Sequence, residues 1–248
     1  MRDFEDSTLW RISAFERIRL QTGSSGFMRM DGPTVLPTTL LADLRRLDAD
    51  PLSTDALEVV AACLRHRESA LLCLEHESLV WPVTLFPNDG LYHSPRDISQ
   101  ASADGFLRLR LLTTEPPGVR PPGHWMHERI AQVEHYRPIK PLLWRLALHG
   151  PRHTLLADIA GPAVYRVVNG PDGERPSAPG AMGSALDKLK RNSVNLAEIA
   201  RWPGMSTERA SRLLNGLYLA GNLMTTRAHA VPRSWLASAS PQRRRDAN

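Results

Sequence analysis

The 248-residue chain is poor in the residues that build disulfide scaffolds and thiolate metal sites, since it has only two cysteines. Two cysteines cannot form a disulfide framework or a four-cysteine zinc site. No apolar run approaches the roughly 20 residues that a membrane span requires, and the start MRDFEDST lacks the apolar core of a signal peptide. These absences predict a soluble, cytoplasmic protein with no membrane partner.

Lysine is also scarce, because only three of the 31 basic residues are lysines (Lys140, Lys188 and Lys190). Such an arginine bias is typical of a GC-rich genome and indicates a bacterial source. Aromatic residues make up only 6% of the chain, but 42% of its residues are hydrophobic. That content, at this length, is enough for the core of one large domain or of two small ones.

The net charge of +5 is distributed unevenly along the chain. Residues 1–179 hold 20 basic and 22 acidic residues, whereas residues 180–248 hold 11 basic and four acidic residues. The C-terminal quarter therefore carries the whole positive excess, which predicts a polyanionic partner for this part alone. The alternative is a basic tail that aids solubility, because Arg243–Arg245 supply three of these charges.

Proline and glycine mark the expected domain boundaries. Residues 169–180, NGPDGERPSAPG, contain three prolines and three glycines and predict a linker. This linker would separate a domain over 1–168 from a module over 181–235, which a basic flexible tail over 236–248 follows. Residues 113–123 contain four prolines, which cannot lie inside a helix or a central strand, and they predict a further break near 115–123.

The first domain is predicted to mix helices and strands. Apolar residues at helical spacing predict helices over 38–47 and 53–67, the latter capped by Ser53 or Thr54. Strand-forming residues follow over 70–76 and 79–86, where Pro82 predicts an edge strand. Alternation in FLRLRLL predicts a strand over 106–112, and helices are expected over 124–135 and 140–150.

These elements predict an α+β domain in which helices flank an antiparallel sheet with one solvated face. Its element order resembles that of small scaffold domains of the roadblock or PAS-like kind. The resemblance implies that this domain senses a signal or dimerises.

The C-terminal module carries the most specific local pattern. Asn195 and Glu198 have the spacing of a capping box, and Trp202-Pro203-Gly204 interrupts the helical pattern that follows. Ser206 is placed to cap a further helix, and Gly221 to end it in a left-handed conformation. Residues 223–231 then return as an extended segment.

This pattern resembles the winged helix-turn-helix superfamily over about 50 residues. The residues that carry the resemblance are Leu196, Ile199, Ala200, Gly204, Met205, Ala210, Leu213 and Leu217. The expected fold class is therefore α+β, with an N-terminal antiparallel sheet, its flanking helices and a C-terminal helical, winged-helix-like domain. A short helical bundle that only packs and presents a solvated basic face is the alternative.

The resemblance implies a recognition helix over Ser206–Asn215. Arginine reads guanine, asparagine reads adenine, and serine or threonine holds phosphate. The residues expected to face a partner are Thr207, Arg209, Ser211, Arg212 and Asn215 on the helix, with Arg227 and His229 on the wing. Gly216 weakens the helix interior, and Tyr218 and Leu219 are expected to leave apolar surface on the polar side.

The sequence thus predicts a non-enzymatic regulator that binds duplex DNA, with a protein–protein adaptor or homodimer as the alternative. No phosphate loop, nucleotide fingerprint or nucleophile elbow occurs, so neither a cofactor nor an activity is expected. An enzyme within 1–168 stays open as a third hypothesis. Its weak metal candidates are His124 and His127, which a surface helix also explains, and Cys63 and Cys73 are expected to be buried thiols.

Overall fold

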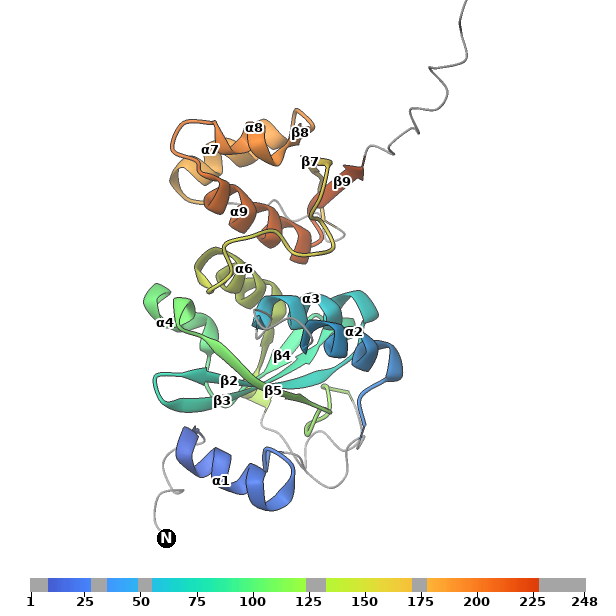
Figure 1. The fold of residues 1–248 in the computed structure, drawn as a ribbon, viewed down its shortest axis with the longest axis vertical. Helices are drawn as coiled ribbons and strands as arrows, with labels where there is room; N and C mark the ends of the chain where they lie inside the picture. The colour runs from blue at the N-terminus through green and yellow to red at the C-terminus, as the bar shows by residue number, and fades with distance from the viewer. Residues whose placement is uncertain (1–8, 28–34, 49–54, 124–132, 171–177, 228–248) are drawn as a thin grey trace, which may run out of the picture.

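The computed structural model describes residues 9–27, 35–48, 55–123, 133–170 and 178–227. These residues form two antiparallel sheets, one in the lower and one in the upper part of the molecule as drawn, with packed helices between them (Figure 1). The first sheet belongs to the N-terminal part of the chain and the second to the C-terminal part.

The first sheet has the strand order β5-β2-β3-β4-β6, and β1 pairs with β3 outside this path. Its strands are β1 (Trp10–Arg11), β2 (Ala70–His76), β3 (Leu79–Phe86), β4 (Leu91–His93), β5 (Arg110–Glu115) and β6 (Tyr136–Pro138). All of its pairings are antiparallel, which confirms the predicted sheet type. The bounds of β2 and β3 are those that the strand-forming runs predict.

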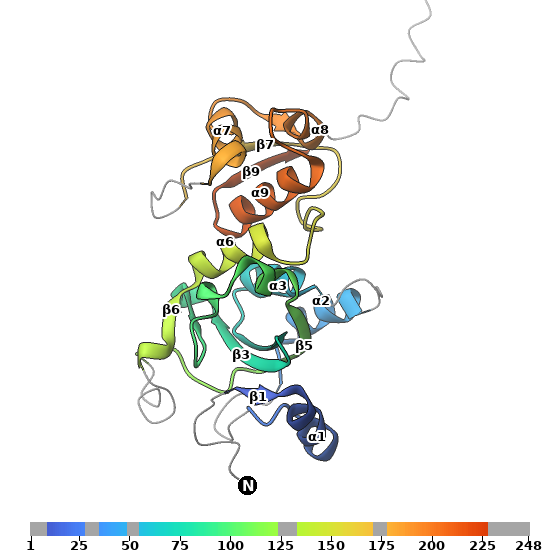
Figure 2. The same ribbon diagram turned by 90° about the vertical axis from the view of Figure 1, so that its left-hand side faces the viewer.

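Helices cover both faces of this sheet (Figures 1 and 2), and residues on both faces of β2 and β3 are buried. The prediction of one solvated face is therefore wrong, because α1 packs on the face opposite the larger core. One face packs Phe15 of α1 (Ile12–Thr22) against Leu71, Cys73 and Val80. The other face carries the larger core, beneath α2 (Thr38–Asp48), α3 (Ala56–His66), α4 (Ala103–Leu107) and α6 (Ile139–His149). Short 3-10 turns occupy Pro87–Asp89, Ile98–Gln100 and Val133–His135.

Two local predictions for this domain are wrong. The cap of α3 is Asp55, whose carboxylate accepts from the Leu57 amide at 2.8 Å, and not Ser53 or Thr54. The predicted strand over 106–112 is divided between α4 and β5. The reason is that Ser102 accepts from the Gly105 amide at 3.0 Å and starts a short helix there, which leaves Leu107 exposed.

Pro82 lies in a central strand, although the sequence predicts an edge. It pairs with Cys73 of β2 on one side. On the other side it falls between the residues of β3 that pair with β1 (79–80) and those that pair with β4 (84–86). A residue without an N–H group is therefore tolerated, because neither ladder on that side includes its position.

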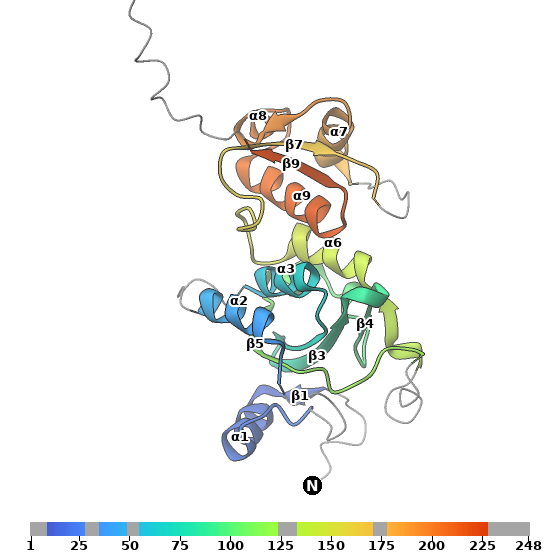
Figure 3. The same ribbon diagram turned by 90° about the vertical axis from the view of Figure 1, so that its right-hand side faces the viewer.

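The described residues of the C-terminal part form three strands and three helices, and Figures 2 and 3 show them from both sides. They are β7 (Ala163–Val167), α7 (Gly180–Leu189), β8 (Val194–Asn195), α8 (Leu196–Ala200), α9 (Thr207–Leu219) and β9 (Leu223–Arg227). The sheet order is β8-β7-β9. Thus β7, which the sequence places in the first domain, is the middle strand of the second sheet.

The local signals in this module are confirmed. Asn195 accepts from the Glu198 amide at 2.9 Å, and Ser206 accepts from the Arg209 amide at 3.1 Å. Gly204, in the turn between α8 and α9, and Gly221, after α9, both have φ of +73°. Only glycine adopts this conformation without strain, so both turns follow from the sequence.

Several predictions fall outside the described residues. One is most of the helix expected over 124–135, which includes His124 and His127. The others are the end of the 223–231 segment with His229, and the tail over 236–248. In the part of the chain that is described, no helix combines the length and the apolar character needed to cross a membrane.

Candidate partner-binding helix and its interface

Helix α9 is the helix of the C-terminal part that contacts the N-terminal part. It packs against α7 and α8 on one side and against α6 on the other (Figure 1). Ala210, Leu213, Leu214 and Leu217 are completely buried, as their helical spacing predicts. Every residue from 210 to 217 is buried, so that only the first turn of α9 is exposed.

The polar side of α9 is not exposed, which corrects the sequence analysis. The exposed fractions of Ser211, Arg212 and Asn215 are 1%, 7% and 0%. Their prediction as outward-facing residues is wrong in this arrangement, because α6 and the loop over residues 150–162 pack onto this side. Buried polar groups require hydrogen-bond partners, and for Arg212 and Asn215 these come from the end of α6 and from the 150–162 loop.

Arg212 binds the end of α6. Its guanidinium donates to the carbonyls of Leu148 at 3.0 Å and Gly150 at 2.7 Å, and also to the carboxylate of Glu208 at 3.0 Å. The last carbonyls of a helix have no partner within the helix and carry the negative end of its dipole. Arg212 therefore caps α6 from the other domain.

Asn215 binds α9 to the 150–162 loop, and Gly216 allows α6 to pack closely against α9. The Asn215 amide donates to the Thr154 carbonyl and accepts from the Leu156 amide, both at 2.9 Å. A Cβ on Gly216 would lie 2.7 Å from two ring carbons of Trp144 in α6. The glycine that weakens the interior of α9 is thus explained by the close approach of α6.

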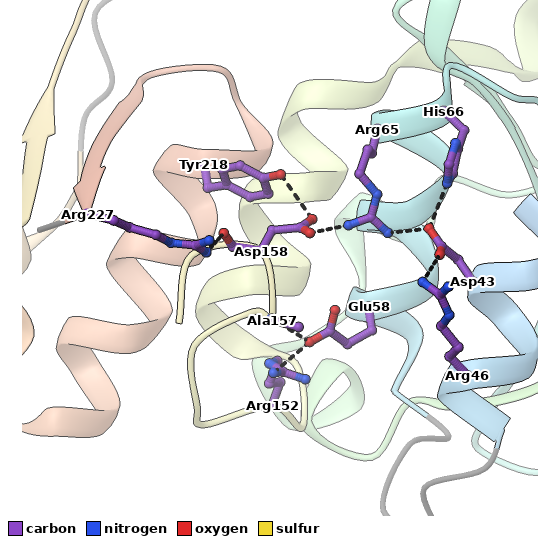
Figure 4. A network of polar contacts seen from close by, with 10 residues as sticks. All are labelled: Asp43, Arg46, Glu58, Arg65, His66, Arg152, Ala157, Asp158, Tyr218 and Arg227. Carbon is purple, nitrogen blue, oxygen red and sulfur yellow. Dashed lines mark hydrogen bonds and ion pairs between the residues drawn. The ribbon is translucent and has the colours of Figure 1, made fainter. Parts of the chain in front are cut away.

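Asp158 in the 150–162 loop joins α9 and β9 to α3 (Figure 4). Its carboxylate accepts from the Tyr218 hydroxyl at 3.0 Å and pairs with Arg65, and its carbonyl accepts from Arg227 at 2.6 Å. Burial, followed by the charge of Asp158, raises the pKa of Tyr218 to about 12. Arg227 therefore binds the loop, and the apolar surface predicted at Tyr218 and Leu219 is covered, since Leu219 is buried.

The same network continues into α2 through Asp43. Arg65 donates to the Asp43 carboxylate at 2.8 Å, and the Nε2 atom of His66 lies 2.6 Å from it. The hydrogen bond with His66 and the charge of Arg65 hold the pKa of Asp43 below its usual value. Two helices of the first domain and two elements of the second thus share one chain of polar contacts.

We expect Asp43→Asn to lower the free energy of unfolding by about 1 kcal/mol at pH 7, because the network is partly exposed to solvent. A carboxyl group whose pKa is lower in the folded state stabilises the fold above its unfolded pKa. The difference between wild type and variant should therefore shrink as the pH falls below about 4. Urea unfolding at several pH values measures it, with Glu16→Gln on the exposed side of α1 as the control. A difference that widens in acid would contradict this role.

Arg152 holds the 150–162 loop to α3. It pairs with Asp55 at 2.6 Å and with Glu58 at 2.7 Å, and its Nε atom donates to the Thr154 carbonyl at 3.0 Å. Glu58 also accepts from the Ala157 amide at 2.9 Å. Burial raises the pKa of the Glu58 carboxyl group.

Three of the predicted contact residues are exposed, Thr207 and Arg209 in the first turn of α9 and Arg227 in β9, which binds the Asp158 carbonyl. Arg209 donates to the Gly204 carbonyl at 2.6 Å, and the Lys188 ammonium lies 5.0 Å above the ring of Trp202. These contacts place Lys188, Arg201 and Arg209 around the turn between α8 and α9, and all three are exposed. We name this group, together with Thr207, the basic end.

The interface residues on the N-terminal side have no signal in the sequence, because Asp43, Arg65, Arg152 and Asp158 are far apart along the chain. Within the described ranges, no three histidine, cysteine, aspartate or glutamate side chains gather where they could hold a metal ion. Cys63 and Cys73 are buried free thiols, as predicted, and burial raises the pKa of each to about 12.

Of the seven predicted contact residues, the structure brings Thr207 and Arg209 together at a free surface. Ser211, Arg212 and Asn215 are buried, and Arg227, although exposed, donates to the Asp158 carbonyl. Comparison with known proteins found no match to this chain among protein-family models, curated proteins or solved structures.

Proposed function

We propose that this protein is a non-enzymatic regulator whose C-terminal module binds duplex DNA through the basic end. The observation that carries the proposal is the exposure of Lys188, Arg201, Arg209 and Thr207 around one turn, in the part of the chain that holds the positive excess. The succession of helix, short strand, helix, helix and strand from α7 to β9 supports the winged-helix resemblance.

The chemistry of the basic end suits a phosphate backbone. Arginine and lysine pair with phosphate oxygens, and the threonine hydroxyl can donate to them. The basic end also surrounds the beginning of α9, a helix of 13 residues, where the free amides favour an anion. In this arrangement the module binds the DNA phosphates electrostatically, while the N-terminal domain senses a signal or dimerises.

The test is the salt dependence of binding to duplex DNA. Each lost phosphate contact reduces the magnitude of the slope of log K against log salt by about 0.9. The double variant Arg201→Ala with Arg209→Ala should therefore reduce it by the amount expected for about two lost contacts. Affinity at about 0.1 M salt should fall at least roughly tenfold. The matched control is Arg17→Ala with Arg19→Ala, which removes two exposed arginines from α1 at the opposite end of the molecule. Equal loss in both double variants would contradict a localised site.

A protein adaptor is the second candidate, and one observation favours it. The residues that a DNA reader would need in the middle of α9 are buried, namely Ser211, Arg212 and Asn215, and the last two form hydrogen bonds within the chain. Absence of any wild-type binding to duplex DNA at about 50 mM salt, where phosphate contacts are strongest, would reject the DNA proposal and leave the adaptor.

A further inference from the structure

The contact between α9 and the N-terminal domain combines apolar packing with buried polar contacts. On the α9 side the polar contacts come from Arg212, Asn215 and Tyr218 beside Gly216, and their main partners across the contact are backbone groups and one carboxylate. Interfaces between domains that separate are more polar than permanent cores. A surface of this composition would also remain soluble if it were uncovered.

Helix α6 meets α9 through a residue outside its apolar stripe and through one edge of that stripe. Ile139, Leu142, Leu143, Leu146 and Ala147 form the buried stripe at helical spacing. Trp144 lies off this stripe and is the residue nearest to Gly216, followed by Ala147. Withdrawal of α9 would therefore uncover Trp144 and Ala147 and leave the four larger residues of the stripe in place.

The polar contacts that close the interface are accessible to water at their edge. The side chains of Arg65 and Asp158 are 38% and 19% exposed, and partly exposed ion pairs each contribute little to stability. A signal that acts on the first domain has to overcome these contacts together with the buried hydrogen bonds of Arg212 and Asn215 and the apolar packing of α6 against α9.

We propose that α6 and the 150–162 loop are a displaceable cover that blocks one side of α9 from DNA. The inference rests on the proposed function, and it concerns how DNA binding is regulated. In the closed state the protein binds DNA through the basic end alone. In the open state Arg212 and Asn215 lose their backbone partners and become available to guanine and adenine edges in the major groove. If 1% of molecules are open, complete opening raises affinity up to about 100-fold.

The test opens the cover from its own side, without changing α9. Ala147→Gln places a longer side chain where only 3.5 Å separates the Ala147 Cβ from the Cβ position of Gly216. Asp158→Ala is a second, milder variant that removes the carboxylate bound by Arg65 and Tyr218. Pro141→Gln introduces the same residue on the exposed side of α6 and serves as the control. Each full-length protein is examined in two assays.

The first assay measures opening by the rate of hydrogen exchange at the Leu156 amide, which donates to Asn215 of α9 in the closed state. The second measures affinity for a library of duplex DNA sequences at fixed salt. We expect this amide to exchange faster in both opening variants, and both to bind selected sequences at least about tenfold more tightly than wild type. Adding Arg212→Ala to either variant should remove this gain.

Opening without any gain in affinity would overturn the proposal, and so would variants that neither open nor gain. If both variants unfold, the interface is a permanent part of the fold and the cover is not displaceable. In these cases wild-type binding that depends on Arg209 would still support the proposed function. If no protein in the series binds duplex DNA, the proposed function fails as well.

Discussion

Arg152→Ala is expected to lower the free energy of unfolding by about 3–5 kcal/mol, because it leaves two largely buried carboxylates without their cation. Asp55 and Glu58 both pair with this guanidinium, and the same side chain binds the carbonyls of Thr154 and Leu155. The substitution therefore weakens the start of α3 and releases the 150–162 loop together. Urea unfolding at pH 7 measures the loss.

The pH dependence of this loss distinguishes a charge effect from simple loss of packing. Burial raises the pKa of Glu58, so this carboxyl group takes up a proton readily as the pH falls. The neutral form does not require Arg152, and the difference between wild type and variant should shrink in acid. The control is Arg46→Ala, since Arg46 is 81% exposed in its pair with Asp43 and should change stability by less than about 0.5 kcal/mol. Equal losses in the two variants would show that Arg152 is not a buried support.

Asn215→Leu is expected to cost about 2–4 kcal/mol, although leucine is apolar and close to asparagine in size. The substitution leaves the Leu156 amide and the Thr154 carbonyl without partners in a buried place, and each such group costs about 1–3 kcal/mol. Asn192→Leu is the matched control, because Asn192 is exposed in the same module. The measurement is urea unfolding, in which the midpoint concentration should fall while the dependence of the free energy of unfolding on urea concentration stays unchanged.

This result would also separate two roles of one residue. If Asn215 only read DNA, its replacement would leave stability within about 0.5 kcal/mol of the control. A large loss assigns Asn215 to the interface in the resting protein, and any role in DNA binding then belongs to an open state.

Local signals predicted much of the fold. The strand-forming runs give β2 and β3 their bounds, Asn195 and Ser206 cap the helices that follow them, and Gly204 and Gly221 take left-handed conformations. Each of these depends on residues within a few positions along the chain, so their chemistry is readable from the sequence.

The orientation of α9 could not be predicted in the same way. Helical spacing separates the polar side with Arg212 and Asn215 from the apolar side, and a polar side is usually solvated. Here the polar side meets backbone carbonyls and amides over residues 148–156. Backbone groups are the same at every residue, so no sequence pattern indicates that they serve as partners. Of the residues predicted to face outward on α9, only Thr207 and Arg209, in its first turn, are exposed.

The position of β7 makes the C-terminal module inseparable from the chain that precedes its linker. Ala163 pairs with Arg227 and Val167 with Leu223, so the middle strand leaves the ribosome roughly sixty residues before its partner β9. The sheet therefore closes late in synthesis, after α7, α8 and α9 have emerged. A recombination event that moved residues 180–248 alone into another protein would transfer a sheet without its centre. The module can therefore be transferred to another protein intact only together with residues 163–167.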